Sequence, residues 1–137
     1  MEKKYLPIPD SIFIKNYNGY ARTTILVIIT LENIQSWLDA LKDLSQTFVS
    51  KITLHDAKQQ NYIVFTLSHK SNNITIDYDT RLDRLVVDFT NKHVNSCSSF
   101  YQNCLSDPLI NDADIVIESE NSSYEICFTY SKQTISK

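Results

Sequence analysis

Apolar and polar residues alternate along most of the chain, and this period of two predicts strands. The run from Tyr20 to Thr30 is apolar on both parities, which indicates a central strand buried on both faces. Asn18-Gly19 before it predicts a hairpin turn, because a type I′ turn needs positive φ at both central positions. The pattern predicts strands over Ser11–Tyr17, Tyr20–Thr30, Lys51–Asp56, Tyr62–Ser68, Asn73–Asp79, Arg84–Thr90, Ala113–Glu120 and Tyr124–Ser131.

Two segments show helical spacing instead. Leu31 to Phe48 places its apolar side chains on one face, and we expect Trp37, the only tryptophan, to anchor the core there. Lys92–Ser106 predicts a weaker helix, because its Ser and Asn residues are poor helix formers. Asp107-Pro108 ends that helix, since the residue before a proline avoids helical geometry.

These elements follow one another in the order ββαββββαββ and predict a single α+β domain over residues 1–137. We expect one curved antiparallel sheet of about six to eight strands, with both helices packed on one face. The four middle strands have short polar connections, which favours an antiparallel meander. No internal repeat, linker or low-complexity stretch is evident.

Composition excludes several classes of site. The chain has a single glycine, whereas a dinucleotide fingerprint and a phosphate-binding loop each need at least two at fixed spacing. Three cysteines make an odd number, and on a helix Cys97 and Cys104 would lie ~10.5 Å apart along the axis. That separation exceeds the ~7 Å that a disulfide permits, so we expect buried reduced thiols.

Charge is distributed unevenly. The net charge is −3, but residues 1–70 carry +2 and residues 71–137 carry −5, and no Lys or Arg occurs between Lys92 and Lys132. Strand parity places several carboxylates on outward faces, and the candidate partner-binding residues are Asp114, Glu118, Glu120, Glu125, Asp77, Asp79 and Asp88. The alternative is a solvated acidic surface that aids solubility or protects a sheet edge.

No catalytic, cofactor or metal motif is found. The segment from Asp77 to Asp83 places Arg81 and Leu82 where a calcium loop needs an oxygen ligand and a glycine. The three histidines show no ligand spacing with one another or with cysteine. We therefore expect no cofactor and no metal, although a thiol and a histidine brought together by the fold stay an open alternative.

The leading hypothesis is a non-enzymatic protein-binding module, in particular a small acidic immunity-type protein of bacteria that caps the basic surface of a cognate toxin. Acidity argues against nucleic acid as a partner. Without an apolar leader or a long apolar run we expect a cytoplasmic protein with no membrane association. One alternative is a dimeric secretion chaperone or adaptor, and another is an enzyme or small-ligand binder. The oligomeric state stays undetermined.

Overall fold

The computed structural model of the protein describes residues 12–16, 23–56, 61–68, 73–79, 81, 84–119 and 124–132. Within these ranges the chain forms two helices and eight strands, in agreement with the expected α+β class. The elements are β1 (Ile12–Asn16), β2 (Thr23–Thr30), α1 (Ile34–Ser45), β3 (Ile52–Asp56), β4 (Asn61–Leu67), β5 (Thr75–Asp79), β6 (Arg84–Phe89), α2 (Asn91–Ser106), β7 (Asp112–Glu118) and β8 (Tyr124–Ser131). The Asn18-Gly19 turn lies outside the described residues.

The strands form two four-stranded sheets, so the expectation of one antiparallel sheet was wrong. Sheet A has the order β1-β2-β8-β7 and sheet B has the order β3-β4-β6-β5. In each sheet the outer pairs are antiparallel, whereas the central pairs, β2–β8 and β4–β6, are parallel. The middle strands are therefore no meander. A period of two determines which face a side chain occupies but not which strand lies beside it.

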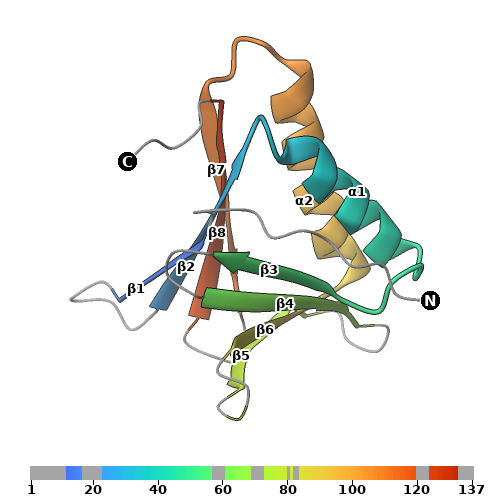
Figure 1. Ribbon diagram of the computed structural model, residues 1–137, viewed down its shortest axis with the longest axis vertical. Coiled ribbons are helices and arrows are strands. Elements are labelled where there is room, and N and C mark those ends of the chain that lie inside the picture. Colours follow the sequence, from blue (N-terminus) through green and yellow to red (C-terminus); the bar gives the residue numbers. More distant parts are fainter. Residues whose placement is uncertain are drawn as a thin grey trace.

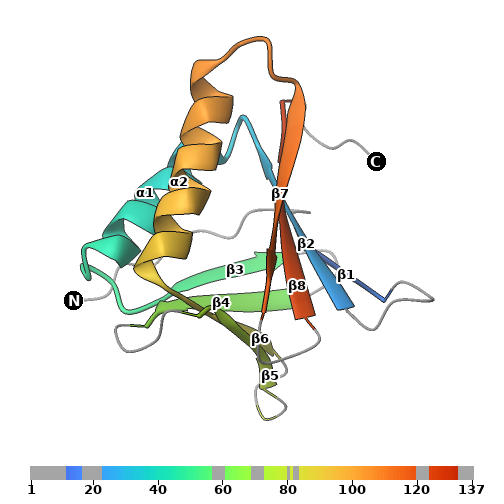
Figure 2. The ribbon, with the colours of Figure 1, turned by 180° about the vertical axis from the view of Figure 1, so that it is seen from behind.

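The helices explain this topology, because each carries the chain from one sheet to the other. α1 leads from β2 in sheet A to β3 in sheet B, and α2 leads from β6 in sheet B to β7 in sheet A. In Figures 1 and 2 the two sheets cross steeply and both helices lie side by side on one side of them. Each helix contacts the other helix and strands of both sheets.

One hydrophobic core fills the space between the sheets and the helices. Most inward positions of β2 to β6 and of β8 are buried as predicted, for example Ile25 and Val87, each with no exposed surface, whereas Ala113 and Ile115 of β7 are only partly buried. Trp37 is 1% exposed and lies at the centre of this core, as expected. Its ring centroid is 5.4 Å from that of Phe65 and 6.1 Å from that of Phe128. The face of β2 that points away from the core is less buried than predicted, because Leu26 and Ile28 on it have intermediate exposure.

α1 is shorter than the predicted helix Leu31–Phe48. It ends at Ser45 because Thr47 adopts a left-handed conformation, with φ of 58°. The backbone N–H of Thr47 donates to the carbonyl oxygen of Leu44 at 3.2 Å, and that of Phe48 donates to the carbonyl oxygen of Asp43 at 2.9 Å. These two bonds form a Schellman-type cap. Phe48, expected on the buried face, is therefore 58% exposed, and Leu31, which precedes the helix, is 40% exposed.

α2 begins at Asn91, one residue before the predicted start at Lys92, and ends at Ser106 as predicted. The Thr90 hydroxyl accepts a hydrogen bond from the backbone N–H of His93 at 3.2 Å, which satisfies one of the free donors of the first turn. Val94, Cys97, Tyr101 and Cys104 form its buried face, whereas Leu105 is 39% exposed. Neither described helix is long and apolar enough to cross a bilayer.

Candidate functional site

β7 is an edge strand of sheet A and carries a row of carboxylates on its outer face. Its residues alternate between the core and solvent, because a strand turns successive side chains to opposite faces. Ile117 points inward and is 7% exposed. The outward positions are all exposed: Asp112, Asp114, Val116 and Glu118.

β8 places a further carboxylate beside this row. Glu118 and Glu125 are direct cross-strand neighbours in the antiparallel register, and Val116 lies opposite Cys127. This hairpin therefore sets like charges side by side. We use the term acidic face for the surface formed by Asp112, Asp114, Val116, Glu118, Glu125 and Cys127.

Within the part of the chain that the structure describes, the carboxylates of the acidic face have no cationic partner. None of the four forms an ion pair with another described residue. The next cation along the chain is Lys132, whose Nζ donates to the carbonyl oxygen of Pro108 at 2.9 Å. Like charges that face each other on a sheet are destabilising. The negative charge is therefore concentrated, and no described cation compensates it.

Cys127 lies within the acidic face, and the pKa of its thiol responds to the neighbouring carboxylates. Burial raises the pKa of its thiol, and the carboxylates of Asp114 and Glu125 raise it further, while a hydrogen bond with the Thr129 hydroxyl opposes the rise. A negatively charged thiolate is disfavoured near other negative charges. Cys127 is only partly buried, whereas Cys97 and Cys104 are buried, and all three are free thiols, as expected for the latter two.

The hairpin β3–β4 occupies the corresponding edge of sheet B and shows that the fold does not require these carboxylates. Both hairpins are antiparallel, and each contains an inward Ile–Phe pair, Ile52–Phe65 in β3–β4 and Ile115–Phe128 in β7–β8. When these two pairs are aligned, the neighbouring cross-strand pairs of the two hairpins also align. The pair of residues 118 and 125 then corresponds to His55 and Tyr62, and Asp114 corresponds to Lys51. The same structural position thus accepts basic and neutral residues.

The remaining candidate residues lie elsewhere. Asp77 is exposed on β5 in sheet B. Asp88 on β6 is partly buried, and its Oδ1 accepts a hydrogen bond from the Thr66 hydroxyl at 2.7 Å. Neither belongs to the acidic face. The side chain of Asp79 and the whole of Glu120 lie outside the described residues.

The structure thus brings together Asp114, Glu118 and Glu125 and adds three residues that sequence reasoning missed, Asp112, Val116 and Cys127. Asp112 was missed because the strand was predicted to begin at Ala113, one position later than β7 does. Val116, 49% exposed, was missed because only the charged side chains on that side of the strand were considered as candidates. Strand parity alone contains the signal for Val116, since it alternates with the two buried or partly buried isoleucines beside it.

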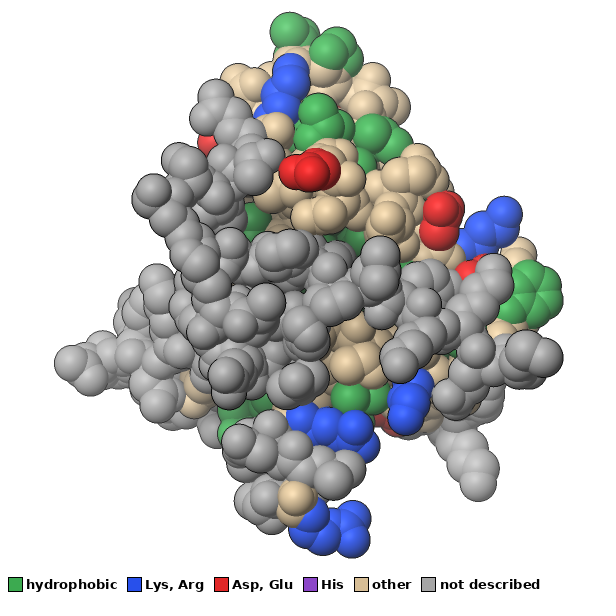
Figure 3. Space-filling model, viewed as in Figure 1, with side chains coloured by type: hydrophobic (Ala, Val, Ile, Leu, Met, Phe, Trp, Pro, Cys, Tyr) green, Lys and Arg blue, Asp and Glu red, His purple; other side chains and the backbone are tan. Residues whose placement is uncertain are grey.

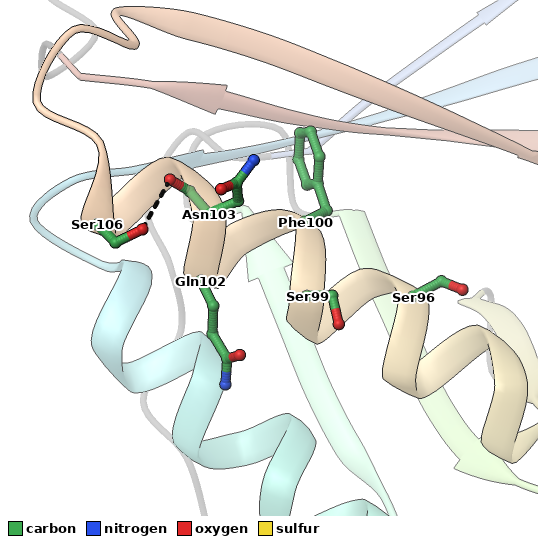
Figure 4. Close-up of a pocket in the computed structure, with 6 residues that line it drawn as sticks. All are labelled: Ser96, Ser99, Phe100, Gln102, Asn103 and Ser106. Carbon is green, nitrogen blue, oxygen red and sulfur yellow. Dashed lines mark hydrogen bonds between the residues drawn. The ribbon is translucent and has the colours of Figure 1, made fainter.

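A shallow depression on α2 is a weaker candidate. It is lined by Ser96, Ser99, Phe100, Gln102, Asn103 and Ser106. Figure 4 shows that these side chains leave the helix in different directions: Gln102 points toward α1, while Phe100 points toward the strands. The dashed bond joins the Ser106 hydroxyl to the backbone carbonyl of Asn103 at 3.2 Å. Ligand sites need several polar groups that converge, and these do not.

Other surfaces offer less concentrated chemistry. On the face shown in Figure 3 the acidic side chains lie mostly apart from one another, and hydrophobic side chains appear near the connection of α2 to β7, where Leu109 is 86% exposed. Among the described residues no group of three or more His, Cys, Asp and Glu is placed to hold a metal ion.

The acidic face is therefore the most distinctive described surface of the molecule. No family model matches the chain, and no curated protein gives a significant match to it.

Proposed function

We propose that the protein is a non-enzymatic protein-binding module that docks a basic protein through the acidic face. The observation that carries the proposal is the cross-strand pair Glu118–Glu125, two carboxylates opposed with no described cation between them. Such a pair costs stability in the free protein. A Lys or Arg of a partner placed between them removes that cost, so the face is better satisfied in a complex than alone.

The apolar centre of the acidic face supports the same proposal. Val116 lies between Asp114 and Glu118 and is about half exposed. Burying it on docking removes apolar surface from water, while the surrounding charges speed encounter and exclude acidic partners. An apolar centre with a polar rim is the usual anatomy of a protein interface.

The alternative explanation is that the carboxylates only protect the edge of the sheet. The matched hairpin β3–β4 argues against this alternative. That hairpin makes the same pairings and has Thr53 and Val64 where the acidic face has Val116 and Cys127. Because the fold tolerates Lys51 where the acidic face has Asp114, protection of a sheet edge does not by itself demand carboxylates at this place.

Within this class we propose an immunity-type protein that caps a cognate toxin. A toxin that acts on nucleic acid needs a basic active surface, because phosphate binding depends on Lys and Arg. A row of exposed carboxylates on a rigid sheet is complementary to such a surface, and the carboxylates can occupy it in place of phosphates. The acidic face is the part of this protein that would fill the toxin's active surface.

Affinity purification of the intact protein from its native host tests the proposal. We expect one stoichiometric protein partner whose binding weakens at least tenfold in the double variant Asp114→Lys, Glu118→Lys and weakens steeply as salt rises. Asp39→Lys is the matched control, since Asp39 is an exposed carboxylate on α1 and lies outside the acidic face. We expect it to leave binding unchanged.

Cys127 supplies a second readout. A partner that covers the acidic face will slow alkylation of the Cys127 thiol in the wild-type protein, measured by mass spectrometry. Cys97 and Cys104 serve as internal references, because they are buried in the free protein. The proposal fails if no protein partner is recovered, or if a recovered partner neither responds to the charge reversal nor protects Cys127.

A further inference from the structure

The two sheets have the same construction when sheet B is read from its β5 edge. Sheet A then reads β1-β2-β8-β7 and sheet B reads β5-β6-β4-β3, each with an antiparallel, a parallel and an antiparallel pair. The chain divides into two ββαββ halves, residues 12–67 and 75–131. Each half places its first hairpin in one sheet and its second hairpin in the other (Figures 1 and 2).

The two halves also match residue by residue, sixty positions apart from the first central strand to the end of the helix. Thr90 is the N-cap of α2, and Thr30, sixty positions earlier, is the last residue of β2, three residues before Asn33, the N-cap of α1. Buried residues of β2 and α1 recur at the same spacing in β6 and α2, as the pairs Ile25/Leu85, Val27/Val87, Ile29/Phe89, Ile34/Val94, Trp37/Cys97, Leu41/Tyr101 and Leu44/Cys104.

A side-chain contact recurs with this spacing. The Asn33 Nδ2 donates to the Thr30 Oγ1 at 3.2 Å, and the His93 Nδ1 lies 2.6 Å from the Thr90 Oγ1. Both contacts join a threonine that precedes a helix to the residue three positions later. Such a contact has no role in strand pairing, so sheet topology does not require its repetition.

The pairing between halves follows the same rule. Val27 pairs with Phe128 in sheet A, and the equivalent Val87 pairs with Phe65 in sheet B. The spacing becomes sixty-three positions after the helices, because three more residues separate the end of the helix from the matched strand positions in the second half. Each of the two parallel central pairs, β2–β8 and β4–β6, joins a strand of one half to a strand of the other. A two-fold axis that relates the halves converts one of these pairs into the other.

Equivalent residues meet at the centre of the core, which places the axis there. The rings of Phe65 and Phe128 have centroids 6.1 Å apart. The indole of Trp37 is near the thiol of Cys97 and opposes the rise in its pKa that burial causes, although its buried Nε1 forms no hydrogen bond with a described residue. Two equivalent side chains touch each other only when both lie near the axis.

We infer that the chain is a duplicated ββαββ unit, fused so that its halves exchange hairpins around an approximate two-fold axis. Neither half can complete a sheet alone, since each central strand takes its parallel neighbour from the other half. Near the axis a large residue faces a small one, Trp37 against Cys97, because two indoles at equivalent positions would overfill the core.

Exchanging the two members of an equivalent pair tests this inference in the intact protein. We compare Trp37→Cys, Cys97→Trp and the double variant by urea unfolding followed with far-ultraviolet circular dichroism. The first variant leaves a void and the second overfills the core. The double variant again pairs a large residue with a small one, but the indole now comes from α2 and the thiol from α1. The new indole again meets Phe65 and Phe128. We therefore expect the urea midpoint of the double variant to lie above those of both single variants.

Cys104 provides the matched control. It is a second buried cysteine on the same face of α2, but its equivalent is Leu44 and not Trp37. The double variant Trp37→Cys, Cys104→Trp should therefore show no recovery, with a urea midpoint no higher than that of its less stable single variant.

A gentler pair protects the test against variants that fail to fold. Tyr101 donates its hydroxyl to the carbonyl oxygen of Thr129 at 3.1 Å, and the equivalent acceptor in the other half belongs to Thr66. We expect each single variant to lower the urea midpoint. We expect the double variant Leu41→Tyr, Tyr101→Leu to lower it by no more than half of the sum of the two single shifts. The inference is overturned if neither exchanged pair recovers stability, or if the Cys104 control recovers as much as the Trp37–Cys97 exchange.

Discussion

At the scale of single residues, Thr47 shows how a chain with one glycine ends a helix. The last turn of α1 needs a left-handed residue so that two backbone N–H groups can reach back to carbonyl oxygens. Glycine normally fills this position because a Cβ atom crowds the backbone there. Thr47 takes it instead, and its β-branched side chain makes the conformation more costly.

We expect Thr47→Gly to raise the free energy of unfolding by about 1 kcal/mol, because it removes the steric cost of φ at 58°. The gain exceeds the entropic cost of glycine in the unfolded chain. Urea unfolding at equilibrium measures it, and Thr47→Ala is the control, since alanine keeps the Cβ atom. A glycine variant that is less stable than the alanine variant would contradict this account of the helix end.

At the scale of elements, the hairpin β7–β8 combines a buried face that stabilises it with an outer face that does not. Ile126 and Phe128 have no exposed surface, whereas Glu118 and Glu125 oppose each other on the other side. The inward residues hold the hairpin on the core, so the outer face is free to carry a charge pattern that is unfavourable for folding.

We expect Glu118→Lys to stabilise the free protein by about 0.5 kcal/mol, because it replaces a repulsive cross-strand pair with an attractive one. The gain should shrink as ionic strength rises. Thermal unfolding at low and high salt measures both effects, with Glu118→Gln as the neutral control. No gain at low salt would show that the two carboxylates do not interact.

The alternation along each strand largely predicted which face of the sheet a side chain occupies. It did not predict which strands lie beside one another. The inward positions of β3 and β6 were identified, because burial depends on the alternation of the chain itself. In β4 the alternation was less reliable, since Val64, predicted to face outward, is 3% exposed. The parallel pairs were missed, since pairing depends on where α1 and α2 deliver the following strand. Of the acidic face, Asp114, Glu118 and Glu125 were predictable from parity, whereas Asp112 depended on the exact start of β7.

The repeat was missed for a related reason. Ile25, Val27 and Ile29 recur as Leu85, Val87 and Phe89, but the identical positions are few and common apolar types fill the rest. The spacing becomes informative only when the pairing in the two sheets and the two threonine contacts, Thr30–Asn33 and Thr90–His93, show that the matched residues occupy equivalent places.

At the scale of the whole molecule, the two sheets share one core and cannot unfold separately. α1 and α2 each contact both sheets, and Trp37 touches the phenylalanines of β4 and β8. We expect a single two-state transition in which the fluorescence of Trp37 and the circular dichroism of the helices and strands change together. Two separate transitions, or probes with different midpoints, would contradict a shared core.

The central parallel pair of sheet A also affects how the protein folds as it is synthesised. Ile25 pairs with Ile126, about a hundred positions later, so β2 keeps an open hydrogen-bonding edge until β8 leaves the ribosome, after every other described element. Contacts of such long range slow folding. Chains cut short before β8 would expose an apolar strand edge that invites aggregation. The face proposed for partner binding would then exist only on finished chains, which keeps incomplete ones from occupying the partner.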